Sequence, residues 1–261
     1  MYALVLVCLV SSVMAYTDEA MADKVENLPG AEALNITFNQ FSGYIPVGES
    51  KQLRYWFYEA ESDAANKPLT FWSNGGPGCS GLLGAMTEQG PFRPNKDLKL
   101  EMNPYSWNKV SNMVFIEAPA GVGFSYSDNE DDYKTGDDQT ANDNYDLIQG
   151  FLKRFPEYSK NSLYITSESY GGHYMPTLAK VIVDQNKAGS QPVLNFKGFA
   201  VGNPYTNFYS GTPSGLVTYW GHQLVAKPTW DEYSKKCFET TPSNPKQATE
   251  CSDLMVVLFE Q

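Results

Sequence analysis

Basic side chains and histidines are scarce in this sequence. Its 261 residues include 19 Lys and Arg against 30 Asp and Glu, a formal net charge of -11, and 2 histidines, His173 and His222. No cluster of Lys and Arg stands out, so an anionic partner such as a nucleic acid would be repelled on average. The histidines lack metal-ligand spacing to each other or to the cysteines, and "GGPGCSG" lacks the lysine of a phosphate-binding loop. We therefore expect no nucleic-acid partner, no metal and no cofactor.

Long hydrophobic runs are also missing, apart from one at the start. Residues 1–15 are apolar and end in Val13-Met14-Ala15, which suits a signal peptide cut after Ala15, although no basic segment precedes the run. A membrane anchor is the alternative, but the run is shorter than the roughly 20 residues of a spanning helix. We expect no membrane anchor and a protein that is secreted or sent to the vacuole or lysosome. Asn35, in the sequon Asn35-Ile36-Thr37, could then carry a glycan.

Cysteine is rare, and the number that remains after cleavage is odd. Removal of residues 1–15 removes Cys8 and leaves Cys79, Cys237 and Cys251 in an oxidising compartment. Cys237 and Cys251 flank the polar loop "FETTPSNPKQATE" and would close a short ring, which is the pairing that we favour. Cys79 is then left without a partner, a first indication that part of the protein is absent.

The hydrophobic pattern alternates between strands and helices. The expected strands are 41–47 and 52–60, which form a hairpin, followed by 69–74, 112–119, the run that begins at 163, and 194–203. An amphipathic helix that carries Tyr145 and Leu152 ends before Pro156, and a second helix spans about 171–187. Strands that alternate with helices of this size predict an α/β fold with a largely parallel sheet and flanking helices, preceded by the antiparallel hairpin.

The pattern changes after Pro204. Three stretches look helical without further strands, and the sequence stops at Gln261 within the apolar run 254–259. We therefore predict a leader (1–15), the N-terminal part of an α/β core (16–204), and the start of a helical insertion or cap that is cut short (205–261). The last strands of the sheet would be missing.

The stretch "LYITSESYGGHYMP" resembles a nucleophile elbow, in which a strand turns sharply into a helix and exposes a serine. The turn brings together the positions two residues before and after Ser169, so both must be small. Gly171 satisfies this condition, and Ser167 stands where glycine is usual. The alternative is an ordinary helix N-terminus.

A second stretch, "LTFWSNGGPGCSG", places a glycine-rich loop directly after a strand. In this arrangement a backbone N–H turns outward to meet a developing oxyanion. The alternative for this stretch is a plain loop.

Four motifs in order, these two together with "FIEAPAGVGFSYS" and "GFAVGNPYT", resemble the serine carboxypeptidase family of the α/β-hydrolase fold over residues 36–260. The resemblance implies that Ser169 is the acylated nucleophile and that the N–H groups of Gly76 and Tyr170 form the oxyanion hole. It also implies a subsite for the terminal carboxylate of a peptide substrate, formed by Trp72, Asn74, the Gly75 backbone, Glu88 and Glu168.

Two glutamates beside a substrate carboxylate make physical sense only if one of them is protonated. Crowding two acids raises the pKa of at least one, and the neutral form then donates a hydrogen bond to the ligand. An acidic working pH follows. Taken separately, Glu168 could be a surface acid at a strand end, and Glu88 an acid in the last turn of a helix.

The acid and base that would activate Ser169 are not found in this sequence. Asp184 lies about 13 residues along the elbow helix, roughly 20 Å from the serine. His222 falls at the first helix of the insertion, and His173 lies one turn past Ser169, where packing is its expected role. We therefore predict that the complete protein is a serine carboxypeptidase acting on peptide or protein C-termini, and that this chain alone is nearly inactive. The alternatives are an acyltransferase of the same family and a non-catalytic fragment that binds peptide C-termini.

Overall fold

The computed structural model describes residues 16–238. The chain forms two compact units, and the boundary between them falls between Pro204 and Tyr205. The expected change from an α/β pattern to a helical one lies at the same place in the sequence. Residues 1–15 and Cys251 lie outside the described part, so the signal peptide and the Cys237–Cys251 disulfide stay predictions.

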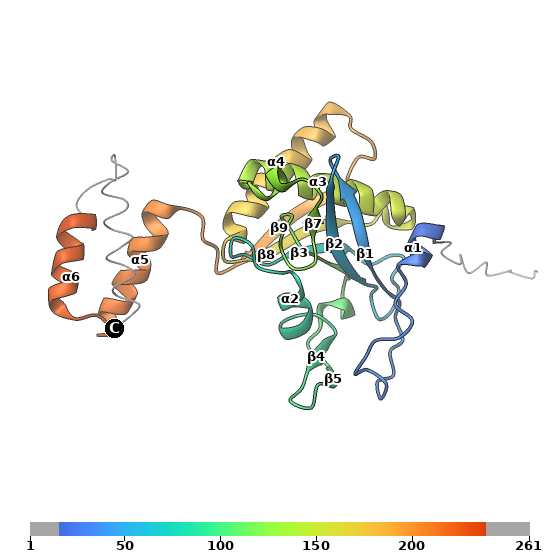
Figure 1. The fold of residues 1–261 in the computed structure, drawn as a ribbon, viewed down its shortest axis with the longest axis horizontal. Helices are drawn as coiled ribbons and strands as arrows, with labels where there is room; N and C mark the ends of the chain where they lie inside the picture. Colours follow the sequence, from blue (N-terminus) through green and yellow to red (C-terminus); the bar gives the residue numbers. More distant parts are fainter. Residues whose placement is uncertain (1–15, 239–261) are drawn as a thin grey trace, which may run out of the picture. The chain divides into compact units, whose positions relative to one another are not determined.

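The first unit is built on a seven-stranded sheet with the order β1-β2-β6-β3-β8-β9, in which β7 also pairs with β2 (Figure 1). The strands are β1 (Gln40–Val47), β2 (Lys51–Tyr58), β3 (Leu69–Ser73), β6 (Asn112–Ile116), β7 (Tyr126–Ser127), β8 (Leu163–Glu168) and β9 (Phe196–Gly202). β1, β2 and β6 pair antiparallel, whereas β6, β3, β8 and β9 are parallel neighbours. The prediction of a largely parallel sheet preceded by an antiparallel hairpin is confirmed.

Helices flank this sheet. They are α1 (Asp18–Ala22), α2 (Leu82–Thr87), α3 (Asp137–Arg154) and α4 (Gly171–Ala188), with short 3-10 turns at Trp107–Lys109, Glu130–Tyr133 and Pro156–Tyr158. A separate two-stranded sheet joins β4 (Phe92–Pro94) to β5 (Leu100–Met102). Figure 1 shows α3 and α4 on one side of the large sheet and α2 with β4 and β5 on the other.

Aromatic and aliphatic side chains fill both faces of the sheet. Under α3 and α4, the rings of Phe57, Phe151 and Phe155 pack at centroid distances between 4.6 and 5.2 Å, and all three are fully buried. On the other face, Trp72 and Phe115 pack with residues of α2 and β4. Full burial of one such side chain stabilises the fold by about 1.5–3 kcal/mol, so the two clusters fix the sheet between its layers.

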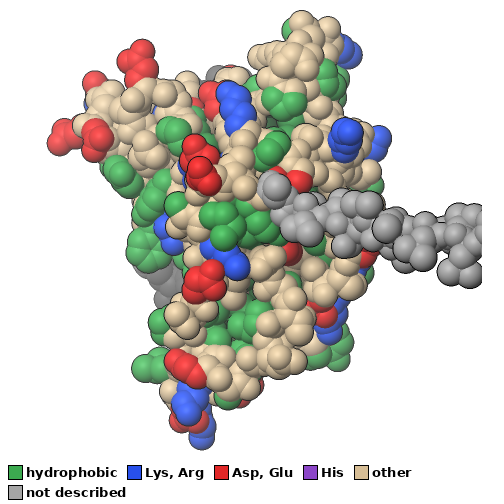
Figure 2. Space-filling model, turned by 90° about the vertical axis from the view of Figure 1, so that its right-hand side faces the viewer, with side chains coloured by type: hydrophobic (Ala, Val, Ile, Leu, Met, Phe, Trp, Pro, Cys, Tyr) green, Lys and Arg blue, Asp and Glu red, His purple; other side chains and the backbone are tan. Residues whose placement is uncertain are grey.

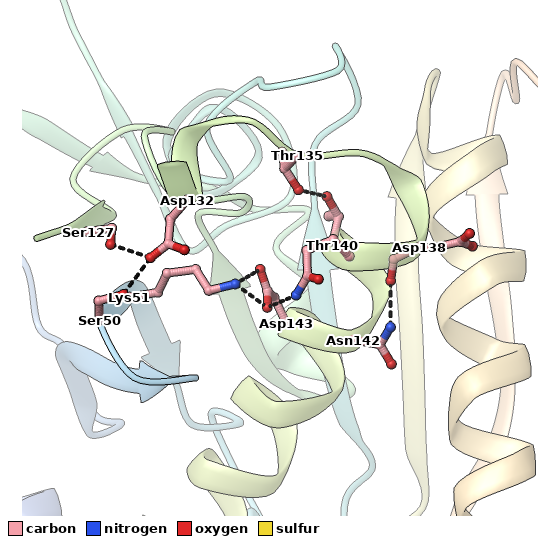
Figure 3. A network of polar contacts seen from close by, with 10 residues as sticks. Ser50, Lys51, Ser127, Asp132, Thr135, Asp138, Thr140, Asn142 and Asp143 are labelled. Carbon is pink, nitrogen blue, oxygen red and sulfur yellow. Dashed lines mark hydrogen bonds and ion pairs between the residues drawn. The ribbon is translucent and has the colours of Figure 1, made fainter. Parts of the chain in front are cut away.

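A buried polar network ties the hairpin to α3 (Figure 3). The Lys51 ammonium lies 2.6 Å from both carboxylate oxygens of Asp143, which also accepts a hydrogen bond from Gln139 at 2.8 Å. Beside this pair, Asp132 accepts hydrogen bonds from the hydroxyls of Ser50 (2.6 Å) and Ser127 (2.5 Å). The network crosses from the start of β2 to α3 and to the loop after β7, so three segments distant in sequence are held together.

The surface carries charges of both signs. On the face drawn in Figure 2, acidic and basic side chains are interspersed with apolar ones, and no large basic patch is visible. Within the described range, 16–238, no helix has the length and apolar character needed to span a membrane.

The second unit is helical where it is described. It contains α5 (Phe208–Gly221) and α6 (Lys227–Tyr233), followed by a π-helical turn at Ser234–Phe238. Leu216, Tyr233 and Cys237 are buried together, and the rings of Trp220 and Trp230 stack at 5.2 Å. The helical character predicted after residue 204 is thus present as far as Phe238.

Some boundaries differ from those predicted. β2 ends at Tyr58 and β6 at Ile116, each a few residues earlier than expected. The N–H groups of Glu59 and Glu117 make the last ladder bonds, to the Asn39 and Arg54 carbonyls at 3.0 Å. α3 begins at Asp137, well before Tyr145, the first residue on which the helix was predicted. Carboxylates in the first turn of a helix interact favourably with its dipole, which accounts for the earlier start.

Candidate active site

Ser169 sits at a strained bend between β8 and α4. Its φ angle is +53°, in the left-handed region that a non-glycine residue rarely adopts. The Ser169 N–H donates to the carbonyl of Gly202 at 2.9 Å, which anchors the bend to β9, and the Ser169 side chain is exposed. A Cβ at Gly171 would lie 1.9 Å from the hydroxyl oxygen of Ser167, so glycine is required there. These are the features of a strand-turn-helix elbow that presents a serine.

The glycine-rich loop after β3 packs directly against this bend. A Cβ at Gly75 would lie 2.6 Å from both the Glu168 carbonyl oxygen and the Tyr170 nitrogen, and 3.0 Å from the Ser169 Cβ. Gly76 follows with a φ of +111°, and within the described residues its N–H donates no hydrogen bond. The loop therefore lies where the sequence predicted it, with the backbone at 75–76 beside Ser169 and the Tyr170 amide.

Asn74 connects the loop to two glutamates. Its side-chain oxygen accepts hydrogen bonds from the Trp72 indole (2.8 Å) and the Gly84 N–H (3.1 Å). These two donors fix the amide orientation, so its NH2 group faces the carboxylates of Glu88 (3.2 Å) and Glu168 (2.9 Å). The structure thus brings together all the residues that the sequence assigned to a carboxylate subsite, next to the Ser169 bend.

The surroundings of Glu88 favour its protonated form. Burial raises the pKa of the Glu88 carboxyl, the nearby charge of Glu168 raises it further, and the hydrogen bond from Asn74 partly opposes the rise. Its backbone carbonyl is held by Arg93 (2.9 Å) and by Asn103 (2.9 Å), which fixes the end of α2. A glutamate in this setting keeps its proton to a higher pH than an exposed one, as the crowding argument predicted for one of the two acids.

The two histidines and Asp184 have other contacts. His173 stacks on Tyr170 with ring centroids 4.7 Å apart, and its Nδ1 is 3.7 Å from a carboxylate oxygen of Asp137. His222 directly follows α5 in the second unit, where its N–H bonds to Thr218. Asp184 is on α4 and pairs with Lys180. Across residues 16–238, the Ser169 hydroxyl makes no hydrogen bond to a histidine or to any other side chain.

Other candidate residues have simpler settings. Asn35 is exposed, and its glycosylation stays a prediction. Cys79 is a free, exposed thiol in the loop beside Gly76. In the described part of the chain, no group of three or more His, Cys, Asp or Glu side chains could hold a metal ion.

Three hydrogen bonds around the site were not predicted from the sequence. The hydroxyl of Tyr170 donates to Asp137 at 3.2 Å, and the buried carboxylate of Glu117 accepts hydrogen bonds from Ser80 and from the Phe124 N–H. Glu117 belongs to the motif "FIEAPAGVGFSYS", but its partners lie in two different loops, which a single sequence does not place side by side.

An exposed serine on a tight elbow, a glycine-rich loop against it and a largely parallel sheet beneath are the features of the α/β-hydrolase fold. A family model described as "Serine carboxypeptidase" matches residues 29–260, and the chain belongs to that family. "Serine carboxypeptidase-like 28" of Arabidopsis thaliana is 42% identical over 253 residues, which are 92% of this chain and 54% of that protein. "Serine carboxypeptidase 24" of the same plant is 45% identical over 84% of this chain and 48% of its own length.

A solved structure is similar as well. The crystal structure of Kex1(delta)p, a prohormone-processing carboxypeptidase from Saccharomyces cerevisiae, superposes with a TM-score of 0.79 at 26% identity. The match covers 92% of this chain and 57% of the yeast chain. This chain therefore spans about half the length of the curated relatives it matches.

Proposed function

We propose that the protein to which this chain belongs is a serine carboxypeptidase that releases C-terminal residues from peptides, with Ser169 as its nucleophile. The observation that carries the proposal is the shared hydrogen bonding of Asn74 to Glu88 and Glu168, directly beside the Ser169 bend. Such a group of one amide and two acids can bind a carboxylate when an acid is protonated. A carboxylate next to the scissile bond is what distinguishes a peptide C-terminus from an internal peptide bond.

The chemistry follows from the elbow and the loop. The Ser169 hydroxyl oxygen adds to the carbonyl carbon of the last peptide bond, and the negative charge on the carbonyl oxygen is met by the N–H groups of Gly76 and Tyr170. The C–N bond breaks, and the departing amine takes up the proton that the hydroxyl gave to a general base. Water then cleaves the acyl-enzyme ester, which restores the hydroxyl and releases the shortened peptide.

The general base is the part that we do not assign to this chain. The sequence has 2 histidines. His173 stacks on Tyr170 near Asp137, and His222 belongs to the second unit. We propose that base and acid come from a polypeptide segment outside the 261 residues, and that the chain alone turns over peptides slowly. Loss of triad partners lowers kcat by about four orders of magnitude or more.

The raised pKa of Glu88 sets the direction of the pH dependence. Below that pKa the carboxyl is neutral and donates a hydrogen bond to the substrate carboxylate. As pH rises through it, the proton is lost and the two negative charges repel, so peptide affinity falls. Binding is therefore strongest at acidic pH, which suits the secretory, vacuolar or lysosomal route that residues 1–15 predict.

Peptide binding tests the subsite without requiring turnover. Calorimetry between about pH 4.5 and about pH 7.5 should show that a peptide with a free C-terminus binds tightest at low pH, whereas the same peptide as a C-terminal amide does not bind. Equal binding of acid and amide would refute the carboxylate subsite. Fluorophosphonate labelling tests the nucleophile: we expect slow labelling that is absent from Ser169→Ala. Labelling at a rate normal for serine hydrolases would refute the proposed lack of a base.

The same assays separate the alternatives. An acyltransferase would use Ser169 in the same way but would pass the acyl group to an alcohol, which product analysis with added acceptors detects. The pairing of Glu88 and Glu168 through Asn74 favours a peptide carboxylate as the ligand. A non-catalytic binding protein would bind peptides with a free C-terminus and would leave them intact even when the complete protein is assayed.

A further inference from the structure

A buried carboxylate close to the site has no place in the chemistry described above. Glu117 directly follows β6 and is 1% exposed. One of its carboxylate oxygens accepts a hydrogen bond from the Ser80 hydroxyl, and the other accepts one from the Phe124 N–H at 2.9 Å. No Lys or Arg among residues 16–238 forms an ion pair with it. Burying an unpaired carboxylate is costly, so ordinary packing does not explain its presence.

The two partners of Glu117 belong to the loops on either side of it. Ser80 ends the glycine-rich loop that begins at Asn74, and its hydroxyl oxygen also accepts the Leu82 N–H at 3.1 Å, where α2 starts. Phe124 belongs to the loop 119–125, whose Ser125 hydroxyl donates to the backbone carbonyl of Glu117 at 2.6 Å. Glu117 therefore joins the loop beside Ser169 to a second loop and to the end of a central strand.

The segment between the two anchored ends of the glycine-rich loop has few contacts, one of which joins the Gly78 backbone to the Tyr174 hydroxyl. Gly75 is packed against the Ser169 bend at one end, and Ser80 is bound to Glu117 at the other. Between them Gly76 and Gly78 have φ angles of +111° and +88°, and the internal bond from the Cys79 N–H to the Gly75 carbonyl is 3.1 Å long. Glycine backbone is the most flexible in the chain, so the direction of the Gly76 N–H depends on what fixes the ends.

We propose that Glu117 is a positioning residue for the oxyanion hole: by holding Ser80 and the 119–125 loop, it fixes the direction of the Gly76 N–H. This inference rests on the proposed role of Gly76. A carboxylate suits the task because both of its oxygens accept, and both donors point to it. The 119–125 loop packs closely on this carboxylate: a Cβ at Gly123 would lie 1.7 Å from one of its oxygens, so a side chain at position 123 would displace Glu117.

The test compares Glu117→Gln with a matched buried glutamate. Glu59 is 6% exposed, and its two carboxylate oxygens accept hydrogen bonds from Tyr158 (2.5 Å), Tyr16 (2.5 Å) and Asn39 (3.0 Å), away from the Ser169 bend. Each Glu→Gln change replaces one accepting oxygen by an NH2 group, so both variants lose a comparable buried contact. Three measurements are made on each full chain: hydrogen exchange of residues 74–81 sampled from milliseconds, the rate of Ser169 labelling by a fluorophosphonate, and the affinity for a peptide with a free C-terminus.

We expect Glu117→Gln to speed hydrogen exchange in residues 74–81 several-fold and to slow Ser169 labelling about tenfold or more. The slowing should stay below the roughly 10²- to 10³-fold caused by complete loss of one oxyanion-hole donor. Peptide affinity should stay within about twofold, because Asn74 and Glu88 are held by other contacts. Glu59→Gln should change neither exchange in this segment nor labelling. If Glu117 only stabilised the fold, both variants would change exchange in residues 74–81 and Ser169 labelling to the same extent. That result would overturn the proposal.

Two further variants keep the outcome decisive. If Glu117→Gln does not fold, Ser80→Ala removes only one of the two donors and should still speed exchange in residues 74–81. Unchanged exchange in whichever variant folds refutes the positioning role. Labelling of Ser169→Ala at the rate of the unchanged chain would refute the assignment of the nucleophile instead, and the exchange measurement would still decide whether Glu117 holds the loop.

Discussion

The buried ion pair between Lys51 and Asp143 offers the sharpest test of how the first unit is held together. Their side chains are 9% and 5% exposed, and the Lys51 ammonium lies 2.6 Å from both carboxylate oxygens. Replacing Lys51 by Met keeps most of the volume and the apolar stem of the side chain. The change therefore removes the charge and its hydrogen bonds while leaving the packing nearly intact.

The expected loss is large because Asp143 would stay buried without its cation. Removing one partner of a buried pair costs about 3–5 kcal/mol in the free energy of unfolding. Among the described residues, the side-chain donor that Asp143 would retain is Gln139, at 2.8 Å. Asp146 adds to the cost: burial raises the pKa of its carboxyl, and the charge of Asp143 raises it further, which shows that negative charge is already unfavourable in this region.

Urea unfolding followed by tryptophan fluorescence measures the effect. With a slope of about 2–3 kcal/mol per molar urea, Lys51→Met should lower the midpoint by about 1–2.5 M. The double variant Lys51→Met/Asp143→Leu should recover most of the loss, because an apolar pair of similar size replaces the buried charges. As a control, Lys180→Met removes the exposed pair with Asp184 and should leave the midpoint unchanged. A shift for Lys51→Met no larger than that of the control would refute the reasoning.

Three further outcomes test the site and its surroundings. Gly75→Ala places a methyl group 2.6 Å from the Glu168 carbonyl and the Tyr170 nitrogen, so it should cost about 1–3 kcal/mol and slow Ser169 labelling; normal melting and labelling would contradict this. Glu88→Gln should flatten the rise in peptide affinity at low pH seen by calorimetry, whereas Glu101→Gln, which also removes a carboxylate bonded to an asparagine, should not. Glu157→Gln should raise the melting temperature at neutral pH more than at acidic pH, because burial and the charge of Glu59 raise the pKa of this carboxyl, which has no hydrogen-bond partner among residues 16–238, and its ionisation costs stability as pH increases; an equal effect at both pH values would count against it.

The strands of the sheet were predictable because their apolar runs are short and bounded by turn residues, and the central strands are buried on both faces. β3 and β6 are buried at every position, as expected for central parallel strands. The small elements were not predictable in this way. α1 has five residues: the Thr17 hydroxyl caps it locally at 3.1 Å and also donates to the Arg154 carbonyl at 2.6 Å. The cap is a local signal, but a helix this short depends on the second contact, which joins residues 137 positions apart and has no local signature in the sequence.

The same distinction applies to the site. The elbow at Ser169 and the loop at 74–76 could be located because their chemistry demands small residues at fixed offsets. The contacts between these segments could not be predicted, because Asn74 bonds to Glu88 and Glu168, which are 14 and 94 residues away in the sequence. Glu117 belongs to the motif "FIEAPAGVGFSYS", yet its partner Ser80 lies 37 residues earlier, and neither segment alone indicates that the two side chains pair.

The strain at Ser169 shows why the site depends on the whole sheet. A left-handed conformation at a non-glycine residue costs about 1–3 kcal/mol, and a local turn alone would relax it. Here β8 is paired on both sides, to β3 as far as Ser167 and to β9 as far as Glu168, and the Ser169 N–H then continues the ladder to Gly202 at 2.9 Å. The bend therefore begins where two parallel ladders end. A change that loosens β9, such as proline at Ala200, whose N–H faces β8 in the parallel register, should consequently release the strained angle and slow labelling of Ser169 even though it touches none of the reacting groups, while a valine there should do so far less.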